Sequence, residues 1–463
     1  MVAVGVVLGQ KRVLIAGVRT SQAAFAWAIG LVAFPYLALP LFWVFGRTNF
    51  SGYVNAFRSN DREIRSALTE LDERLNTHRA ELTGDESRFE VFEKLAHAPF
   101  MSGHSTELLI DGDATFASIF EGIESAKNYI LVEFYILRND DIGTQLQQKL
   151  IAKAKEGVRV AVAFDGLASK DLSEKYKDEL RAAGAQVRPF KTTKGEWNRF
   201  QLNFRNHRKI VVVDGRLGFI GGLNVGDEYL GKGPLGAWRD THLRLEGPSV
   251  ISIQLAWLQD WYFAGGRMDN LNWDPVPAPG GSKNAVILPM GPADGFATYN
   301  SYVVHAIHNA RKRVWIASPY FIPDAPAIRA LQLAALRGVD VRVMMPEKAD
   351  SLPVQLAAFA FFERLGAAGV KFFFHSPGFM HQKVTLIDDD LASVGTANFD
   401  NRSFRLNFEI IAAIPDRDFA ADVERMLEED FTHCRPVARE EYTGRSLWFN
   451  LKVRVCYLLS QLM

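Results

Sequence analysis

A short motif occurs twice in this chain and constrains its fold more than any other feature. Both copies have histidine, lysine and aspartate at the first, third and eighth positions, around an apolar run typical of a buried β-strand. The two sets are His207, Lys209 and Asp214, and His381, Lys383 and Asp388. A segment of small residues follows each motif and ends in Asn224 and Asn398. Such a repeat indicates that one structural unit is duplicated.

The duplication extends upstream of the motifs, where the apolar segment 129–135 resembles 314–320. Within the first copy, the pattern predicts a helix at 143–156, a strand at 157–164 and a further helix at 172–183. Strands alternating with helices predict an α/β fold, here as two tandem repeats. Almost wholly apolar strands are expected to be covered on both faces.

The clearest boundary inside the chain is a run rich in proline and glycine, Asp274–Ser282. It divides the two repeats, and the remaining boundaries follow from changes in composition. We expect an N-terminal segment (1–19), a membrane anchor (20–46), a linker of one or two exposed helices (47–97), a first repeat domain (98–274), a short linker (275–283), a second repeat domain (284–435) and an amphipathic tail (436–463).

Residues 20–46 contain no charged side chain. As a helix this run would reach ~40 Å, enough to cross a hydrocarbon core of ~30 Å. Pro35 and Pro40 predict a kink or a break within it. The alternatives are a buried core helix and a signal peptide, but no small-residue cleavage site follows the run. We therefore predict a retained transmembrane helix, whose orientation the flanking basic residues do not determine.

The remaining composition narrows the class of protein. Lysine and arginine balance aspartate and glutamate, so a global basic field that would favour nucleic acid is absent. Cys434 and Cys456 are too few for a disulfide scaffold. The tail places apolar residues around Lys452 and Arg454, which indicates a helix that packs on the domain or lies on a membrane surface.

The motif residues suit the cleavage of a phosphodiester. Histidine and lysine two positions apart on a strand face the same way. One neutral imidazole can attack phosphorus while a protonated one donates to the leaving oxygen, and the lysines and asparagine amides can hold the nonbridging oxygens. No metal-ligand spacing is present, and we expect no metal or cofactor. Asp214 and Asp388 stand at odd spacing from their histidines, so we interpret them as structural residues at the strand ends.

The doubled motif with its downstream asparagines resembles the phospholipase D superfamily. Blocks such as EFYILRNDDIG, DWYFAGG and GTANFDNRSFRLNFEI are similar to those of the bacterial cardiolipin synthases. The resemblance implies mixed β-sheets flanked by helices, and catalytic roles for both motifs. It also implies that an acidic residue orients each histidine, with Asp240 and Glu409 at the matching positions. His207 would be the nucleophile and His381 the general acid.

The implied reaction transfers a phosphatidyl group from one phosphatidylglycerol to another and releases glycerol. The partners would be phosphatidylglycerol, other phospholipids and a membrane, with no nucleic acid and no partner protein implied. The resemblance places the enzyme in the cell (inner) membrane, with its catalytic domains in the cytoplasm. A phospholipase D that uses water as acceptor is the alternative, because the motifs do not determine the acceptor. A scaffold with a dead site is disfavoured, since both motifs are intact.

Overall fold

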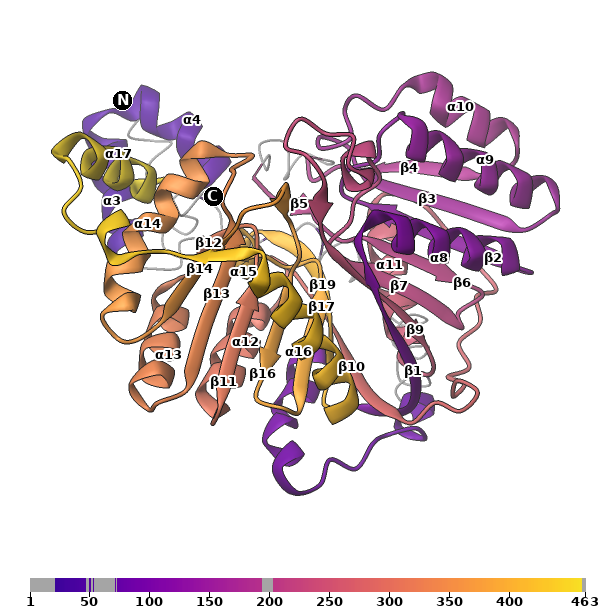
Figure 1. Ribbon diagram of the computed structural model, residues 1–463. Helices are drawn as coiled ribbons and strands as arrows, with labels where there is room; N and C mark the ends of the chain where they lie inside the picture. Colours follow the sequence, from indigo (N-terminus) through magenta and orange to yellow (C-terminus); the bar gives the residue numbers. More distant parts are fainter. Residues whose placement is uncertain are drawn as a thin grey trace.

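The computed structural model describes residues 21–46, 50, 53, 71, 73–193 and 203–459. The predicted segment 1–19 and most of the region between 47 and 70 therefore lie outside the described residues. Two lobes make up the described chain, and they follow the two sequence repeats (Figure 1).

The first lobe is a mixed sheet in which β2, β3 and β4 run parallel and β6, β7 and β9 pair antiparallel. Its elements are β1 (Met101–Ile110), α8 (Asp111–Ser125), β2 (Tyr129–Phe134), α9 (Asp141–Lys155), β3 (Arg159–Asp165), α10 (Glu174–Ala182), β4 (Gln186–Phe190), β5 (Arg205–Asn206), β6 (Ile210–Val213), β7 (Leu217–Gly221), η3 (Asp227–Leu230), β8 (Trp238–Arg239), β9 (Thr241–Glu246) and α11 (Val250–Phe263). The predicted elements at 143–156, 157–164 and 172–183 correspond to α9, β3 and α10.

The second lobe repeats this order, with its sheet strands in the sequence β19-β17-β16-β11-β13-β14 and β20 at the edge. Its elements are β10 (Lys283–Met290), α12 (Thr298–Asn309), β11 (Arg313–Ala317), β12 (Phe321–Ile322), α13 (Ala325–Leu336), β13 (Asp340–Pro346), α14 (Leu352–Gly366), β14 (Lys371–His375), β15 (Phe379–Met380), β16 (Val384–Ile387), β17 (Leu391–Gly395), β18 (Phe399–Asp400), α15 (Asn401–Arg405), β19 (Asn407–Ile414), α16 (Arg417–Thr432), β20 (Cys434–Pro436), η4 (Arg439–Glu441) and α17 (Leu447–Leu458).

The two sheets join at the centre, because β1 pairs with β10 antiparallel. At this joint His104 is fully buried, and its two ring nitrogens bond to the carbonyl of Lys283 (3.1 Å) and the amide of Ser249 (2.9 Å). Burial lowers the pKa of His104 to about 4. The lobes are therefore one continuous sheet system.

Three apolar cores lie in and between the layers. One is under α8, α9 and α10 in the first lobe, and another is under α12, α13 and α14 in the second. The third contains residues of both lobes, such as Ile220 and Leu386, with Trp257 of α11 and Val423 of α16. Because this inner core is shared, burial of apolar surface holds the lobes against each other.

The apolar run expected to be one membrane span forms two helices instead. These are α3 (Ser21–Ala33) and α4 (Pro35–Phe45), which pack together with the Trp27 and Phe42 rings 5.3 Å apart. The break precedes Pro35, which occupies the first turn of α4, where its missing N–H costs no hydrogen bond. Within the described ranges, no helix has both the length and the apolar character needed to cross a membrane.

The region expected to be an exposed helical linker is partly buried. It contains η1 (Gly84–Phe89) and α7 (Val91–Ala96), and Phe89 and Phe92 are inaccessible in the core of the second lobe. Phe50 is also buried, among aromatic rings from both lobes. The many charged residues of this region correctly indicated a solvated face. They did not indicate that a few aromatic side chains are buried against the lobes.

Candidate active site

A short strand that pairs with the opposite lobe ends directly before each motif histidine. β5, directly before His207, pairs parallel with β19, and the amide of His207 donates to the carbonyl of Phe408 (2.9 Å). β15, directly before His381, pairs with β8, and the amide of His381 donates to the carbonyl of Arg239 (2.8 Å). Each lobe thus contributes one strand that pairs with the other lobe, and these two pairings bring both motifs to the interface between the lobes.

This pairing gives each histidine a carboxylate from the other lobe. His207 Nδ1 lies 2.9 Å from Glu409 Oε2, and His381 Nδ1 lies 2.7 Å from Asp240 Oδ2. All four side chains are buried. A carboxylate at Nδ1 leaves Nε2 as the free nitrogen of each ring. Motif spacing predicted the two histidines, and the family resemblance implied an acidic residue downstream of each motif. In the structure each acid pairs instead with the histidine of the other lobe.

The two carboxylates have different surroundings. Glu409 also accepts hydrogen bonds from Thr396 Oγ1 (2.6 Å), Ser403 Oγ (2.8 Å) and Asn407 Nδ2 (3.1 Å). Although burial opposes ionisation, His207, Lys209 and these donors leave the pKa of Glu409 below its usual value.

Asp240 accepts instead from the amide of Thr241 (2.7 Å), besides its contact with His381. Burial raises the pKa of Asp240, although Lys383 opposes the shift. Glu409 is therefore the better stabilised anion of the two.

Both motif lysines lie beside their histidines. Lys209 Nζ donates to the carbonyl of His207 (2.7 Å), and Lys383 Nζ donates to that of His381 and lies 3.8 Å from Asp240 Oδ2. Burial lowers the pKa of Lys383 to about 8 and that of Lys209 well below its ordinary value. The pair thus forms a desolvated cationic site that an anion would stabilise.

The pKa values of both imidazoles are lowered. Burial lowers the pKa of His207 to about 4, against the opposing effect of Glu409. Burial and the charges of Lys383 and Lys209 lower the pKa of His381 well below its ordinary value, and its short contact with Asp240 opposes this. A bound phosphodiester anion would raise both pKa values, because it would offset the lysine charges.

The predicted substrate-binding asparagines are both buried at this interface. Asn224 accepts from the amide of Ile136 (3.1 Å) and donates to Tyr229 Oη (2.9 Å), which leaves one amide hydrogen for a ligand. Among the described residues, Asn398 Oδ1 has no hydrogen-bond partner. Position 222 requires glycine, because a Cβ atom there would lie 2.0 Å from Asp240 Oδ1.

Asp214 and Asp388 are not brought to the histidines. Asp214 accepts from the backbone amides of 127–129, each at 2.8 Å, and Asp388 accepts from those of 311–313 and from Arg88. Both residues have positive φ, 53° and 52°, which places them in the turn that closes each motif strand. They hold the loop before the neighbouring strand in place.

Aromatic side chains that the sequence analysis did not select surround the histidines unequally. Tyr135 is the one ring described beside His207, with centroids 4.7 Å apart. Trp238, Phe379 and Tyr229 surround His381 at 5.1, 5.8 and 5.9 Å. Tyr135 could have been selected because it ends the duplicated segment 129–135. No sequence pattern indicated that the other rings lie near His381.

A buried charge network lies behind the first motif. Arg208 donates to Asp260 Oδ2 (2.7 Å), and the amide of Asn206 bridges Asp260 (3.0 Å) and Glu133 (2.6 Å). Burial and the neighbouring Asp260 raise the pKa of Glu133 well above its usual value. The network fixes the backbone on both sides of His207.

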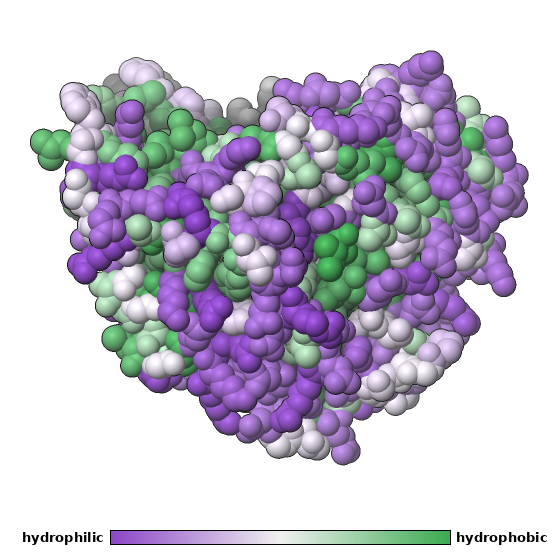
Figure 2. Space-filling model, in the orientation of Figure 1, coloured by the Kyte–Doolittle hydropathy of each residue, from purple (hydrophilic) through white to green (hydrophobic). Residues whose placement is uncertain are grey.

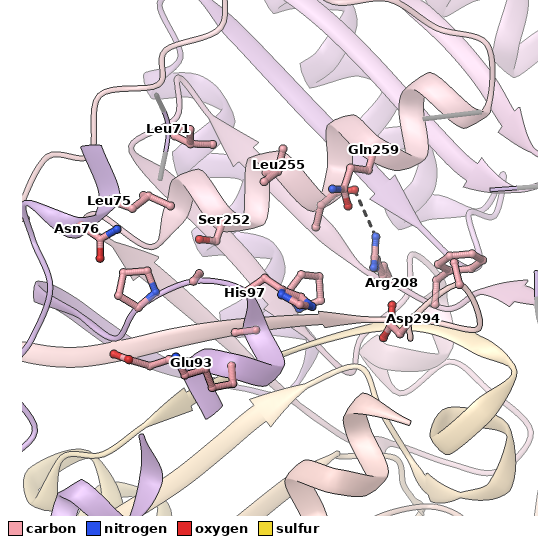
Figure 3. A pocket seen from close by; sticks show the side chains of 18 of the residues that line it. Leu71, Leu75, Asn76, Glu93, His97, Arg208, Ser252, Leu255, Gln259 and Asp294 are labelled. Carbon is pink, nitrogen blue, oxygen red and sulfur yellow. Dashed lines mark hydrogen bonds between the residues drawn. The ribbon is translucent and has the colours of Figure 1, made fainter. Parts of the chain in front are cut away.

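Arg208 also lines a cavity of about 1000 Å³ on the side away from the histidines. Figure 3 shows Arg208 and Asp294 at one end of this cavity, Ser252 and Leu255 of α11 along it, and Glu93 at the other end. Its lining mixes apolar and charged side chains. In the part of the chain that the structure describes, no cluster of three or more histidine, cysteine, aspartate or glutamate residues could hold a metal ion.

Comparison with known proteins agrees with this geometry. The family described as "Cardiolipin synthase, PLD-like domain" matches residues 119–232 and 303–431, which contain both motifs. Proteins named cardiolipin synthase A from Pseudomonas fluorescens and Pseudomonas putida are each 45% identical over 451 residues, 96% of this chain and 94% of each relative. A phosphatidylserine synthase from Haemophilus influenzae has a similar fold, with a TM-score of 0.60 and 15% identity over 81% of this chain and 100% of that one.

Proposed function

The chain belongs to the cardiolipin synthase family of the phospholipase D superfamily and is a phosphatidyltransferase of that family. We propose that it joins two phosphatidylglycerol molecules into cardiolipin and glycerol through a phosphohistidine. The observation that carries this mechanism is the crossed pairing of the motif histidines with Glu409 and Asp240. In this proposal the two oriented imidazoles, with the two lysines beside them, act on one phosphate.

In the first step, His207 Nε2 attacks the phosphorus of the donor lipid, and the bond from phosphorus to the glycerol oxygen breaks. His381, protonated once the anionic lipid is bound, gives its proton to the departing glycerol oxygen. Lys209 and Lys383 hold the nonbridging oxygens as charge develops on them. We assign an assisting role to the amide groups of Asn224 and Asn398.

In the second step, the terminal glycerol hydroxyl of another phosphatidylglycerol attacks the phosphohistidine. His381 takes the hydroxyl proton, the bond from phosphorus to nitrogen breaks, and both imidazoles return to their initial states. The bond formed is of the same kind as the bond broken in the first step. The reaction is therefore close to thermoneutral, and added glycerol should drive it backwards.

The unequal carboxylates support the assignment of roles. A phosphorylated imidazole that keeps its Nδ1 proton is a cation, and Glu409, the better stabilised anion, would balance that charge on His207. A general acid must release its proton easily. Burial and the charges of Lys383 and Lys209 lower the pKa of His381 and so favour this release.

The proposal also places the enzyme at the cell (inner) membrane with its catalytic lobes in the cytoplasm. The support is the uncharged run 20–46 and the family, whose substrates are lipids. We infer that this run anchors the protein by inserting its apolar side chains, whether as one span or as the two packed helices α3 and α4. Deletion of 20–46 should leave folded lobes that attach less strongly to membranes, and full attachment of the truncated protein would contradict the anchor.

The alternative is a phospholipase D that transfers the phosphatidyl group to water. Purified protein in detergent, given phosphatidylglycerol alone, separates the two activities. A transferase makes cardiolipin and glycerol in equal amounts, and glycerol suppresses the net reaction. Phosphatidic acid as the main product, unaffected by glycerol, would identify a hydrolase.

A further inference from the structure

The C-terminal helix α17 has apolar side chains on two opposite faces, and one of these faces is covered. The covered face lies on α14, where the Phe449 and Phe359 rings are 5.4 Å apart and Tyr457 contacts Phe361 at 5.7 Å. Val453, on the same side, is buried. These contacts attach α17 to the second lobe without help from its other face.

The other face is a stripe of large apolar side chains that lies open. At about 100° per residue, positions three or four apart fall on one side of a helix. The stripe residues and their exposed fractions are Trp448 (75%), Leu451 (50%), Val455 (49%) and Leu458 (76%). Contiguous exposure of this kind marks an interaction surface rather than a solvated helix face.

Cations border the stripe. On a helical projection Lys452 falls at one edge and Arg454 at the other, and both are exposed. Residues 445–459 include a third cation, Arg445, and no acidic side chain. Long cationic side chains can lay their stems along an apolar surface while their charges reach an anionic layer above it.

A second apolar surface lies at the same end of the molecule. Figure 1 shows α3 and α4 in the corner that contains α17, and Figure 2 shows hydrophobic side chains gathered there. The exposed residues of the two helices include Phe25 (69%), Val32 (78%) and Leu37 (67%), and Phe34 (68%) lies between them. Two uncovered apolar helical surfaces in one corner favour a single extended partner.

We propose that the exposed stripe of α17 docks on the surface of a bilayer that contains anionic lipids, with the helix axis in the membrane plane. Apolar side chains with a cation at each edge match the depth order of such a surface, where acyl chains lie beneath anionic headgroups. Trp448 suits this position because indole rings favour the boundary between headgroups and acyl chains. The inference rests on the proposed function in one respect, that the substrates are membrane lipids.

The test reads the environment of the stripe directly. The full chain with Cys434→Ser and Cys456→Ala carries an environment-sensitive nitrobenzoxadiazole label at Val455→Cys, and a matched protein carries it at Arg425→Cys, on an exposed site of α16. The vesicles contain phosphatidylcholine with or without phosphatidylserine, so no phosphatidylglycerol is present to occupy the active site. We expect a severalfold rise in fluorescence at 455, and none at 425, with phosphatidylserine vesicles.

Two variants define the contribution of each chemical feature. Lys452→Gln with Arg454→Gln should weaken binding to phosphatidylserine vesicles about tenfold and reduce its salt dependence, because both charges act through the anionic surface potential. Leu451→Ser with Leu458→Ser should weaken binding further. Both should form cardiolipin in detergent micelles at the unaltered rate, which separates a failure of docking from a failure of the proposed transferase.

Other occupants of the stripe give distinguishable outcomes. Bound protein with unchanged fluorescence at 455 would overturn the proposal, because the stripe would then be away from the bilayer. A rise that depends on protein concentration and not on vesicles would identify a second copy of the chain as the occupant, and would also overturn it.

Discussion

The two lobes share one backbone plan but neutralise their buried acids differently. In the first lobe the arginine stands inside the motif, where Arg208 contacts Asp260 of α11. In the second lobe Gln382 occupies that place, and Asp430 of α16 is bound by Arg239, which comes from the opposite lobe. The position of the positive charge has changed while the strand pairing has not.

This difference shows what the duplicated fold requires of each half. It requires a cation against the acid of α11 or α16, but either the motif or the crossing strand can provide it. The first lobe carries an additional buried acid, Glu133, where the second has Ser318. One arginine then faces two carboxyls, and burial and Asp260 raise the pKa of Glu133.

The largest expected effect distinguishes the two histidines. His207→Ala should reduce cardiolipin formation by at least ~10⁴-fold, because no neighbouring group replaces the nucleophile. His381→Ala should cost about 10²–10⁴-fold with glycerol as leaving group, but far less with a phosphatidyl nitrophenol, which departs without a proton. Rates with both substrates check this, and rescue of the His207 variant instead would reverse the roles.

Substitution of the carboxylate beside His207 should reduce the rate more than substitution of the one beside His381. Glu409→Gln should lower the rate of phosphoenzyme formation by about 10³-fold, since it removes the anion that balances the phosphorylated ring. Asp240→Asn should cost less, about 10²-fold, and mostly with poor leaving groups. Rapid-quench measurement of labelled enzyme gives both values. Equal losses in the two variants would show that the hydrogen bonds of Thr396 and Ser403 to Glu409 have no catalytic consequence.

The charge networks should differ in their contribution to stability. Arg208→Gln copies the second motif but leaves Asp260 without its cation, so it should lower the free energy of unfolding by about 3–5 kcal/mol. Gln382→Ala removes a hydrogen bond to Asp430 but leaves the ion pair with Arg239, and should cost about 1.5–3 kcal/mol. Urea unfolding at pH 7 measures both. In the Arg208 variant, Asp260→Asn should restore part of the loss, and a cost below that of Gln382→Ala would contradict the assigned network.

The smallest effect concerns a histidine that exists in one lobe alone. His242 of β9 occupies the place of Ile411 in β19, and within the described residues its ring nitrogens have no hydrogen-bond partner. Burial lowers its pKa to about 3, so between pH 6.5 and 3 the unfolded chain binds a proton that the folded chain does not. Stability is therefore lost as the pH falls through this window.

His242→Ile should remove that contribution, up to about 1.4 kcal/mol per pH unit, while activity at pH 7.5 stays within about threefold. Urea unfolding from pH 7 to 5 measures the slope. An unchanged slope would mean that His242 titrates alike in the folded and unfolded states.

Much of this could be predicted because repeated spacing is a local property. The strand 157–164 follows from a pattern within a few residues, and the proposed division near Asp274 and the proposed roles of the motif histidines rest on patterns of the same kind. The crossing of Glu409 to His207 could not be predicted, since nothing in the sequence near either residue specifies which lobe lies opposite. Ser403 was missed for the same reason. Pro35 was expected to bend the apolar run, but the packing of α3 on α4 depends on side-chain contacts that the pattern does not specify.

The crossed dyads have a consequence for how such an enzyme could arise and be divided. Produced alone, 98–274 would contain His207 without Glu409, and 284–435 would contain His381 without Asp240. Each fragment would also expose its side of the inner core. The single chain is in this sense a fused homodimer whose two subunits have lost their independence, and fragment complementation is the one route by which separated halves could regain activity.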